Sequence, residues 1–302
     1  LGLAIVDEQH RFGVHQRLAL RDKGAGRNRV PHQLVMTATP IPRTLAMAAY
    51  ADLDVSAIDE LPPGRTPVQT VALSAERRPE LVERIRTACA EGRQAYWVCT
   101  LIDDSDEVVA QAAQTTFEAL SASLPDARVA LVHGRMKAAD KQATMRRFKE
   151  GEVDLLVATT VIEVGVDVPN ASLMIIENAE RLGLAQLHQL RGRVGRGATA
   201  STCVLMYQPP LSMMAKHRLA TMRQTNDGFV IAEKDLELRG PGELLGTRQT
   251  GLAAFRVADL ARDAGLLPQV HALAERLLAD DPAAADRVIH RWVGGAARYA
   301  SA

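Results

Sequence analysis

The alternation of helix-like and strand-like segments between Val71 and Tyr207 constrains the fold of this chain most strongly. Apolar residues spaced three or four apart predict helices, whereas short apolar runs bounded by Gly, Pro or polar residues predict buried strands. Strands joined through helices make right-handed crossovers and form a parallel sheet. We therefore predict an α/β domain. Its predicted helices cover 79–90, 105–124 and 139–150, and its predicted strands cover 95–102, 129–132, 155–158, 173–176 and 203–206.

The segments on either side of this region predict the domain organisation. Pro and Gly residues over 61–70 predict a linker. Helical spacing before and after Asn226-Asp227-Gly228 predicts a helical hairpin, and the glycines between 240 and 251 predict an extended loop. We thus predict four parts. They are the end of a first α/β domain over 1–60, the linker over 61–70, a second α/β domain over 71–208, and a hairpin, loop and helical tail over 209–302.

The first residues predict that the chain is the back part of a longer protein. It begins with Leu1 and not with Met, and it enters a strand-like run at Leu3–Val6 without a preceding turn.

Composition excludes several classes of function. Lys+Arg and Asp+Glu both number 36, so a protein that is basic over its whole surface is excluded, whereas a local basic stripe is not. Aromatic residues make up 4%, which argues against a base-stacking platform. Three scattered cysteines without metal-ligand spacing fit a reducing compartment. Because the longest apolar runs are of strand length, we expect a cytoplasmic protein without a membrane segment.

An acidic pair, Asp7-Glu8, directly follows the first strand-like run. Open α/β sheets place ligands beyond the carboxyl ends of their strands. One carboxylate there could hold Mg²⁺ while its neighbour polarises an attacking water. The alternative is a solvated turn. Thr37 and Thr39 follow the second strand-like run, Gln33–Met36, in the same way.

Arginines alternate with glycines after Gln189, in Arg191-Gly192-Arg193-Val194-Gly195-Arg196-Gly197. Glycines let the backbone approach closely, so that the guanidinium groups of Arg193 and Arg196 could converge on a small anion such as the γ-phosphate. A basic turn on a solvated face is the alternative, and we favour the phosphate interpretation.

Two threonines, Thr159 and Thr160, directly follow the predicted strand 155–158, and Gly165 and Asp167 come next. Threonine hydroxyls and backbone N–H groups suit contacts with a phosphate backbone, and the later pair could bind a ribose. The same residues could instead cap the turn between a strand and a helix.

Taken in order, these segments resemble the sequence motifs of superfamily 2 helicases. The stretch 229–251 is similar to the translocation motif shared by RecG branch-migration helicases and bacterial transcription-repair coupling factors. Arg239–Gly251, Val257–Leu260 and Arg291-Trp292 resemble the RecG family more closely. The resemblance implies RecA-like motor domains, the second complete and the first only as its C-terminal remnant. It also implies that ATP and Mg²⁺ drive movement on branched double-stranded DNA, such as stalled forks and Holliday junctions.

The resemblance implies roles for individual residues. Near the nucleotide it places Asp7 on Mg²⁺, Glu8 on the attacking water, Gln189, Arg193 and Arg196 at the γ-phosphate, and Gly165 and Asp167 in the cleft. At the DNA and in coupling it places Thr37, Thr39, His133, Gly134, Arg135, Thr159, Thr160, Arg239 and Gln249. We expect a monomer, with a single-stranded-DNA-binding protein as a candidate partner.

One departure from the helicase pattern limits this interpretation. The 302 residues contain no Gly-x-x-x-x-Gly-Lys-[Ser/Thr], so the loop that cradles phosphates is missing and we predict that the chain alone is inactive. Two alternatives remain open: a translocase like the transcription-repair coupling factors, and a non-enzymatic nucleic-acid-binding module. Glu8, Arg193 and Arg196 speak against the second, because a passive module has no use for them.

Overall fold

The computed structural model describes residues 2–7, 19–20, 31–37, 55–58, 60, 65–100, 106–160, 167–197, 199–239 and 263–292. The chain forms two compact units, residues 58–231 and residues 1–57 with 232–302.

The unit 58–231 is built on a six-stranded parallel sheet with strand order β3-β8-β7-β4-β6-β5. The strands are β3 (Gln69–Ser74), β4 (Gln94–Val98), β5 (Val129–Val132), β6 (Leu155–Ala158), β7 (Ala171–Ile176) and β8 (Thr202–Tyr207). All five residues of β4, in the middle of the sheet, are buried. A parallel sheet covered on both faces explains why these strands are continuous apolar runs. The predicted α/β fold is confirmed.

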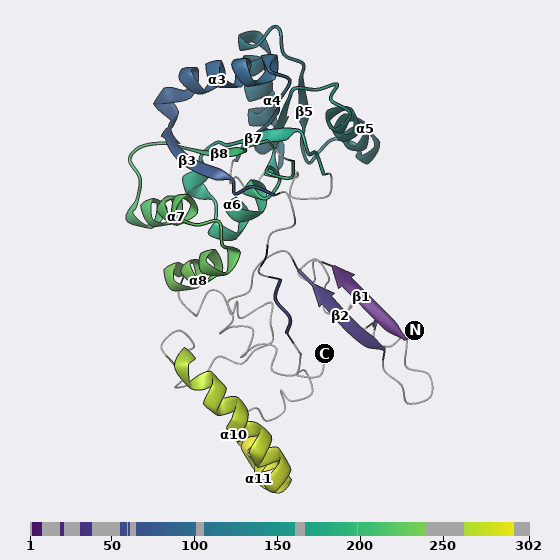
Figure 1. Ribbon diagram of the computed structural model, residues 1–302, viewed down its shortest axis with the longest axis vertical. Helices are drawn as coiled ribbons and strands as arrows, with labels where there is room; N and C mark the ends of the chain where they lie inside the picture. Colours follow the sequence, from purple (N-terminus) through teal and green to yellow (C-terminus); the bar gives the residue numbers. More distant parts are fainter. Residues whose placement is uncertain are drawn as a thin grey trace. The chain divides into compact units, whose positions relative to one another are not determined.

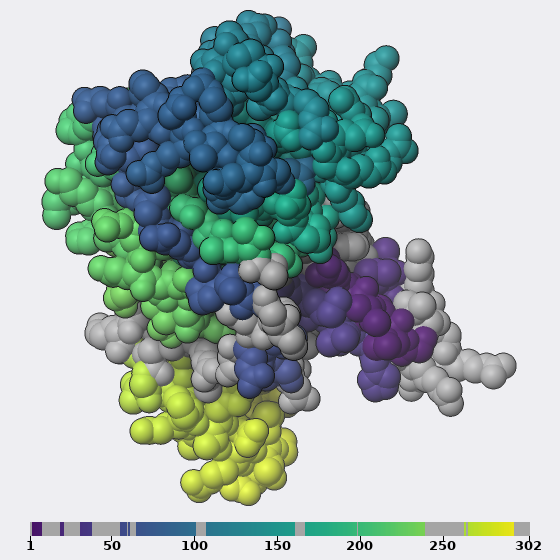
Figure 2. Space-filling view, turned by 45° about the horizontal axis from the view of Figure 1, so that its top comes forward, coloured from purple at the N-terminus to yellow at the C-terminus, as the bar shows by residue number. Residues whose placement is uncertain are grey.

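Helices cover both faces of this sheet. Figure 1 shows α3 and α4 on one side of it and α6 and α7 on the other. In Figure 2 the blue segment that contains β3 and α3 packs directly against the teal and green segments that follow it. The elements are η2 (Ala75–Arg77), α3 (Arg78–Ala90), α4 (Asp106–Ser123), α5 (Ala138–Lys149), η4 (Ala179–Arg181), α6 (Leu184–Arg191) and α7 (Met213–Gln224).

Successive side chains of the central strand belong to two different cores, because side chains alternate across a strand. Trp97 packs in a cluster with Ile85 of α3 and Leu120 of α4. Its neighbour Tyr96 faces the other way and meets Phe148 of α5 edge to face, with ring centroids 4.9 Å apart.

Two further helices follow the sheet in the chain, where the sequence predicts a helical hairpin. Ser212 caps α7, since its hydroxyl accepts a hydrogen bond from the Ala215 backbone N–H at 3.1 Å. The buried face of α7 consists of Ala215, Leu219 and Met222, as the helical spacing predicts. The second of these helices is α8 (Gly228–Arg239). The predicted glycine-rich loop lies outside the described residues.

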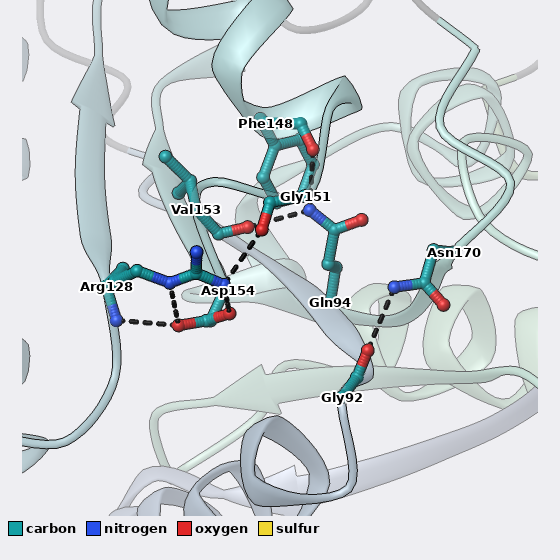
Figure 3. Close-up of polar contacts among 8 residues, drawn as sticks. All are labelled: Gly92, Gln94, Arg128, Phe148, Gly151, Val153, Asp154 and Asn170. Carbon is teal, nitrogen blue, oxygen red and sulfur yellow. Dashed lines mark hydrogen bonds and ion pairs between the residues drawn. The ribbon is translucent and has the colours of Figure 1, made fainter.

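The loops at the amino-terminal edge of the sheet are joined by side-chain hydrogen bonds (Figure 3). The amide of Gln94, at the start of β4, donates to the carbonyl oxygens of Phe148 at 2.6 Å and Val153 at 2.7 Å. Arg128, just before β5, contacts both carboxylate oxygens of Asp154, at 2.6 and 3.0 Å. These bonds tie the loops before β4, β5 and β6 to one another.

The other unit contains a second parallel strand pair, β1 (Leu3–Asp7) and β2 (His32–Met36), in which Asp7 pairs with Met36. It also contains η5 (Ala264–Leu266), α10 (Leu267–Asp280) and α11 (Pro282–Trp292). Both helices lie within the predicted helical tail, and they are separated at Asp281. Over the described residues, no helix has the length and apolarity needed to cross a membrane.

Candidate nucleotide and nucleic-acid site

The arginine loop, which we define as Gly192–Gly197, begins where α6 ends. Two of its glycines, Gly195 and Gly197, lie where a side chain would collide with neighbouring segments. A Cβ atom on Gly197 would lie 2.4 Å from the Pro169 carbonyl oxygen, and one on Gly195, at φ +77°, would lie 2.7 Å from the Val68 side chain. The glycines therefore allow close backbone packing and the positive φ at Gly195.

Arg196 of this loop contacts Asp167, which lies 29 positions earlier in the chain. The Arg196 Nη1 lies 3.3 Å from the Asp167 Oδ1, and the Arg196 Nε donates to the Gly192 carbonyl oxygen at 3.2 Å. The Arg196 side chain is 32% exposed. The sequence predicts both residues to act near a nucleotide, and the structure brings them into contact.

Gln189 lies on α6 and Arg193 follows it, and both are half-buried. The charges of Arg193 and Arg196 reach Tyr96 in β4. Burial raises the pKa of Tyr96 to about 12, and the two arginines act in the opposite direction. The loop is therefore a local concentration of positive charge in a chain with no formal net charge.

Arg191 differs from the other arginines of the motif, because only 2% of it is exposed. Its Nη1 donates to the carbonyl oxygens of Met222 and Thr225, both at 2.9 Å, and its Nη2 lies 3.1 Å from the His188 Nδ1. Burial lowers the pKa of Arg191. Arg191 thus joins α6 to the last carbonyls of α7.

Arg218 of α7 also connects α7 to the segment that precedes α6. It donates to the carbonyl oxygens of Leu182 at 2.6 Å and Glu180 at 3.0 Å, on the segment that leads into α6. The sequence analysis assigned no structural role to Arg191 or Arg218. A signal for Arg191 is its place four and seven residues after the buried Leu187 and Leu184, on the apolar face of α6.

The predicted nucleic-acid residues gather at the carboxyl ends of β5 and β6. The strands pair in register, and the Thr159 backbone N–H donates to the Val132 carbonyl oxygen at 3.2 Å, so Thr159 lies beside the start of the turn at His133. The Thr159 hydroxyl and the His133 Nδ1 are buried and have no hydrogen-bond partner within the described residues. Buried polar groups of this kind usually serve a ligand or a water.

The rest of this turn carries positive charge. Gly134 and Arg135 follow His133, and Thr160 follows Thr159. The Arg135 side chain is exposed and pairs with Glu107 at 3.3 Å. Such a weak surface pair can exchange for a phosphate.

Two further predicted residues, Asp7 and Thr37, lie close together at the same edge of the strand pair in the other unit. Asp7 is exposed at the end of β1, and Thr37 directly follows its partner strand β2. Within the described ranges, no three His, Cys, Asp or Glu side chains come close enough to hold a metal ion. Glu8, Thr39, Gly165, Gln249 and the side chain of Arg239 lie outside the described residues.

Two protein families match the chain. Residues 77–198 match the family described as helicase conserved C-terminal domain. Residues 225–290 match the family described as ATP-dependent DNA helicase RecG, domain 3, C-terminal. The first match covers most of the sheet and the arginine loop, and the second begins at the end of α7.

Curated relatives match over nearly the whole chain. ATP-dependent DNA helicase RecG of Escherichia coli (strain K12) is 66% identical over 100% of this chain and 44% of its own length. RecG of Thermotoga maritima is 51% identical over 88% of this chain and 34% of its own length. The chain thus spans less than half the length of these relatives.

Solved structures of helicases have a similar fold. A structure of RecG bound to a three-way DNA junction superposes with a TM-score of 0.67 and 47% identity, over 88% of this chain and 33% of that chain. The helicase MrfA bound to DNA has a TM-score of 0.54 at 14% identity over 79% of this chain and 35% of that chain, which shows a shared fold alone.

Proposed function

Since the chain belongs to the RecG family of ATP-dependent DNA helicases, we propose that it is part of a motor that hydrolyses ATP to move along double-stranded DNA. The proposed substrates are branched DNAs, on which the motor migrates Holliday junctions and regresses stalled forks. The observation that supports this most is the arginine loop, in which a half-exposed Arg196 and Asp167 meet beside a buried structural arginine. The match of 225–290 favours RecG over a coupling-factor-like translocase.

In this proposal Arg193 and Arg196 neutralise the negative charge that develops on the γ-phosphate. Gln189 helps to position the γ-phosphate. Arg196 fits this role because its guanidinium is partly open to solvent and its present anionic partner is a surface carboxylate. Asp167 and Gly165 would line the nucleotide cleft.

Asp7 fits a role in holding Mg²⁺ through water, because its carboxylate is exposed directly after a strand of a parallel pair. When bound, Mg²⁺ would neutralise negative charge on the phosphate oxygens. Glu8 would accept a proton from the attacking water.

We further propose that His133, Gly134, Arg135, Thr159 and Thr160 contact the DNA backbone. The unpaired hydroxyl of Thr159 and ring nitrogen of His133 support this, since a phosphate oxygen or a bound water would satisfy them. Thr37 and Thr39 would connect hydrolysis to movement. We propose a cytoplasmic monomer that a single-stranded-DNA-binding protein recruits to branched DNA.

The test is a chimera in which this chain replaces the segment that it matches in the Escherichia coli relative. We expect the chimera to hydrolyse ATP when a synthetic four-way junction is added, and to unwind that junction. Arg196→Ala should lower kcat by about 10³- to 10⁵-fold while binding of a fluorescent ATP analogue survives. Arg77→Ala removes an exposed arginine paired with Glu80 and should leave both activities unchanged. Hydrolysis at the normal rate in Arg196→Ala would remove this arginine from the mechanism.

The role of the hairpin and its loop has a separate test in the same chimera. We propose that Arg239 and Gln249 couple hydrolysis to movement and take little part in hydrolysis. Arg239→Ala or Gln249→Ala should leave DNA-stimulated hydrolysis largely intact and sharply lower the rate of junction unwinding. Only the ratio of the two rates separates coupling from hydrolysis, and an equal loss of both would assign these residues to hydrolysis or to folding.

A further inference from the structure

The segment that leads into β3 lies against the arginine loop. The Arg65 Nη2 donates to the Gly192 carbonyl oxygen at 3.3 Å. The same oxygen accepts the bond from the Arg196 Nε, at 3.2 Å. One carbonyl therefore holds two guanidinium groups, one from the segment before the sheet and one from the arginine loop.

A second contact joins the same two segments. A Cβ atom on Gly195 would lie 2.7 Å from the Val68 Cγ2 and 3.6 Å from the Thr66 carbonyl oxygen. Val68 is buried, and the next residue, Gln69, donates its backbone N–H to the Ser201 carbonyl oxygen at 3.0 Å. Residues 65–69 therefore follow the loop along its length, and the bond from Arg65 is not an isolated surface contact.

The charge of Arg65 suits its position. Gly192 directly follows the last residue of α6, where a helix carries partial negative charge and unpaired carbonyl oxygens. Arg65 also contributes, after burial and Arg191, to a lowered pKa of His188 on the same helix. Because like charges repel, Arg65 also opposes movement of the Arg196 guanidinium away from Asp167 toward the segment before β3.

We propose that Arg65 is a positioning residue for Arg196. By holding the Gly192 carbonyl, it fixes the Nε of Arg196 and leaves the two terminal nitrogens directed at an anion. The segment that connects to the rest of the motor thus sets the orientation of the arginine that meets the phosphate. This inference rests on the proposed function of Arg196.

The first experiment uses the 302-residue chain and needs no activity. Backbone amide hydrogen exchange over 193–197 is compared between the unsubstituted chain, Arg65→Ala and Arg86→Ala. Arg86 is an exposed arginine paired with Glu83 on α3, which makes it the matched control. We expect faster exchange over 193–197 in Arg65→Ala alone, and unchanged exchange in β4 and β7.

The second experiment measures ATP hydrolysis by the chimera. Arg65→Ala should lower kcat by roughly 10- to 100-fold, because a small displacement of a reacting group is costly, while the KM for ATP changes less than about twofold. Arg65→Lys keeps the charge and one donor and should recover part of the lost kcat.

Each outcome decides the proposal. Unchanged exchange over 193–197, or faster exchange through the whole sheet, overturns it, and so does an unchanged kcat. If the unsubstituted chimera hydrolyses no ATP, the proposed function fails, whereas the exchange experiment still shows whether Arg65 orders the loop.

Discussion

Among single side chains, His188 is held in its neutral form. Its Nδ1 lies 3.1 Å from the Arg191 Nη2, and since a guanidinium only donates, the ring nitrogen accepts. Burial, followed by the charges of Arg191 and Arg65, lowers the pKa of His188 to about 4. Protonation would both break this bond and place a second cation beside Arg191.

His188 therefore predicts a loss of stability in mild acid. Its folded pKa lies below the unfolded value of 6.5, so its contribution is present above pH 6.5 and is lost as the pH falls toward about 4. At about 1.4 kcal/mol per pKa unit, the loss is about 3 kcal/mol. In urea unfolding of the 302-residue chain, His188→Gln should reduce the fall in unfolding free energy between pH 7 and pH 4 by about this amount. His217→Gln, on the exposed face of α7, is the control, and equal pH profiles for His188→Gln and the unsubstituted chain would contradict the prediction.

The three arginines of the motif lie in different surroundings, which their spacing with glycine does not distinguish. The sequence predicts that Arg193 and Arg196 act near a phosphate, and this role stays a prediction, while the structure places Arg196 against Asp167 with 32% of its side chain exposed. Arg191 has the same side chain and is buried as a structural connection between helices. Spacing alone could not separate these roles, because the bonds of Arg191 reach residues more than 30 positions away.

Among the elements, the arginine loop packs closely against the neighbouring segments at Gly195 and Gly197. Gly197→Ala places a Cβ 2.4 Å from the Pro169 carbonyl oxygen, and backbone on both sides must shift to accept it. We expect a loss of roughly 1–3 kcal/mol in the free energy of unfolding, typical of overpacking. Gly265→Ala is the matched control, since nothing lies within 4 Å of its added Cβ. Both variants are measured by urea unfolding, and equal stabilities would show that the loop yields at little cost.

The helices and strands of the sheet were largely predictable, because each is encoded locally. Helix 79–90 was predicted where α3 covers Arg78–Ala90, and helix 139–150 where α5 covers Ala138–Lys149. The strand order β3-β8-β7-β4-β6-β5 was not predicted, since it depends on contacts between segments far apart in the chain. For the same reason the bond from Arg65 to Gly192, 127 positions later, could not be predicted.

For the molecule as a whole, the sequence itself predicts an inactive motor. The 302 residues hold the arginines proposed to meet the γ-phosphate but no Gly-x-x-x-x-Gly-Lys-[Ser/Thr] to cradle the other phosphates. We expect the purified chain to release no phosphate from ATP, with or without a four-way junction. The chimera, prepared in the same way, serves as the positive control. Junction-stimulated turnover by the chain alone would show that its phosphate site is built in another way.

The pairing of β3 with β8 determines how this unit carries tension. Residues 65–68 lead into the amino end of β3, and α7 follows the carboxyl end of β8, while the two strands are parallel and paired over six positions from Gln69↔Thr202 to Ser74↔Tyr207. A pull between residues 65–68 and α7 therefore acts along the strands and loads their evenly spaced hydrogen bonds together, in shear. Bonds loaded in shear share the force, whereas bonds at the end of a hairpin open one after another. A force applied between the two ends of this unit therefore meets the mechanically strong direction of its sheet.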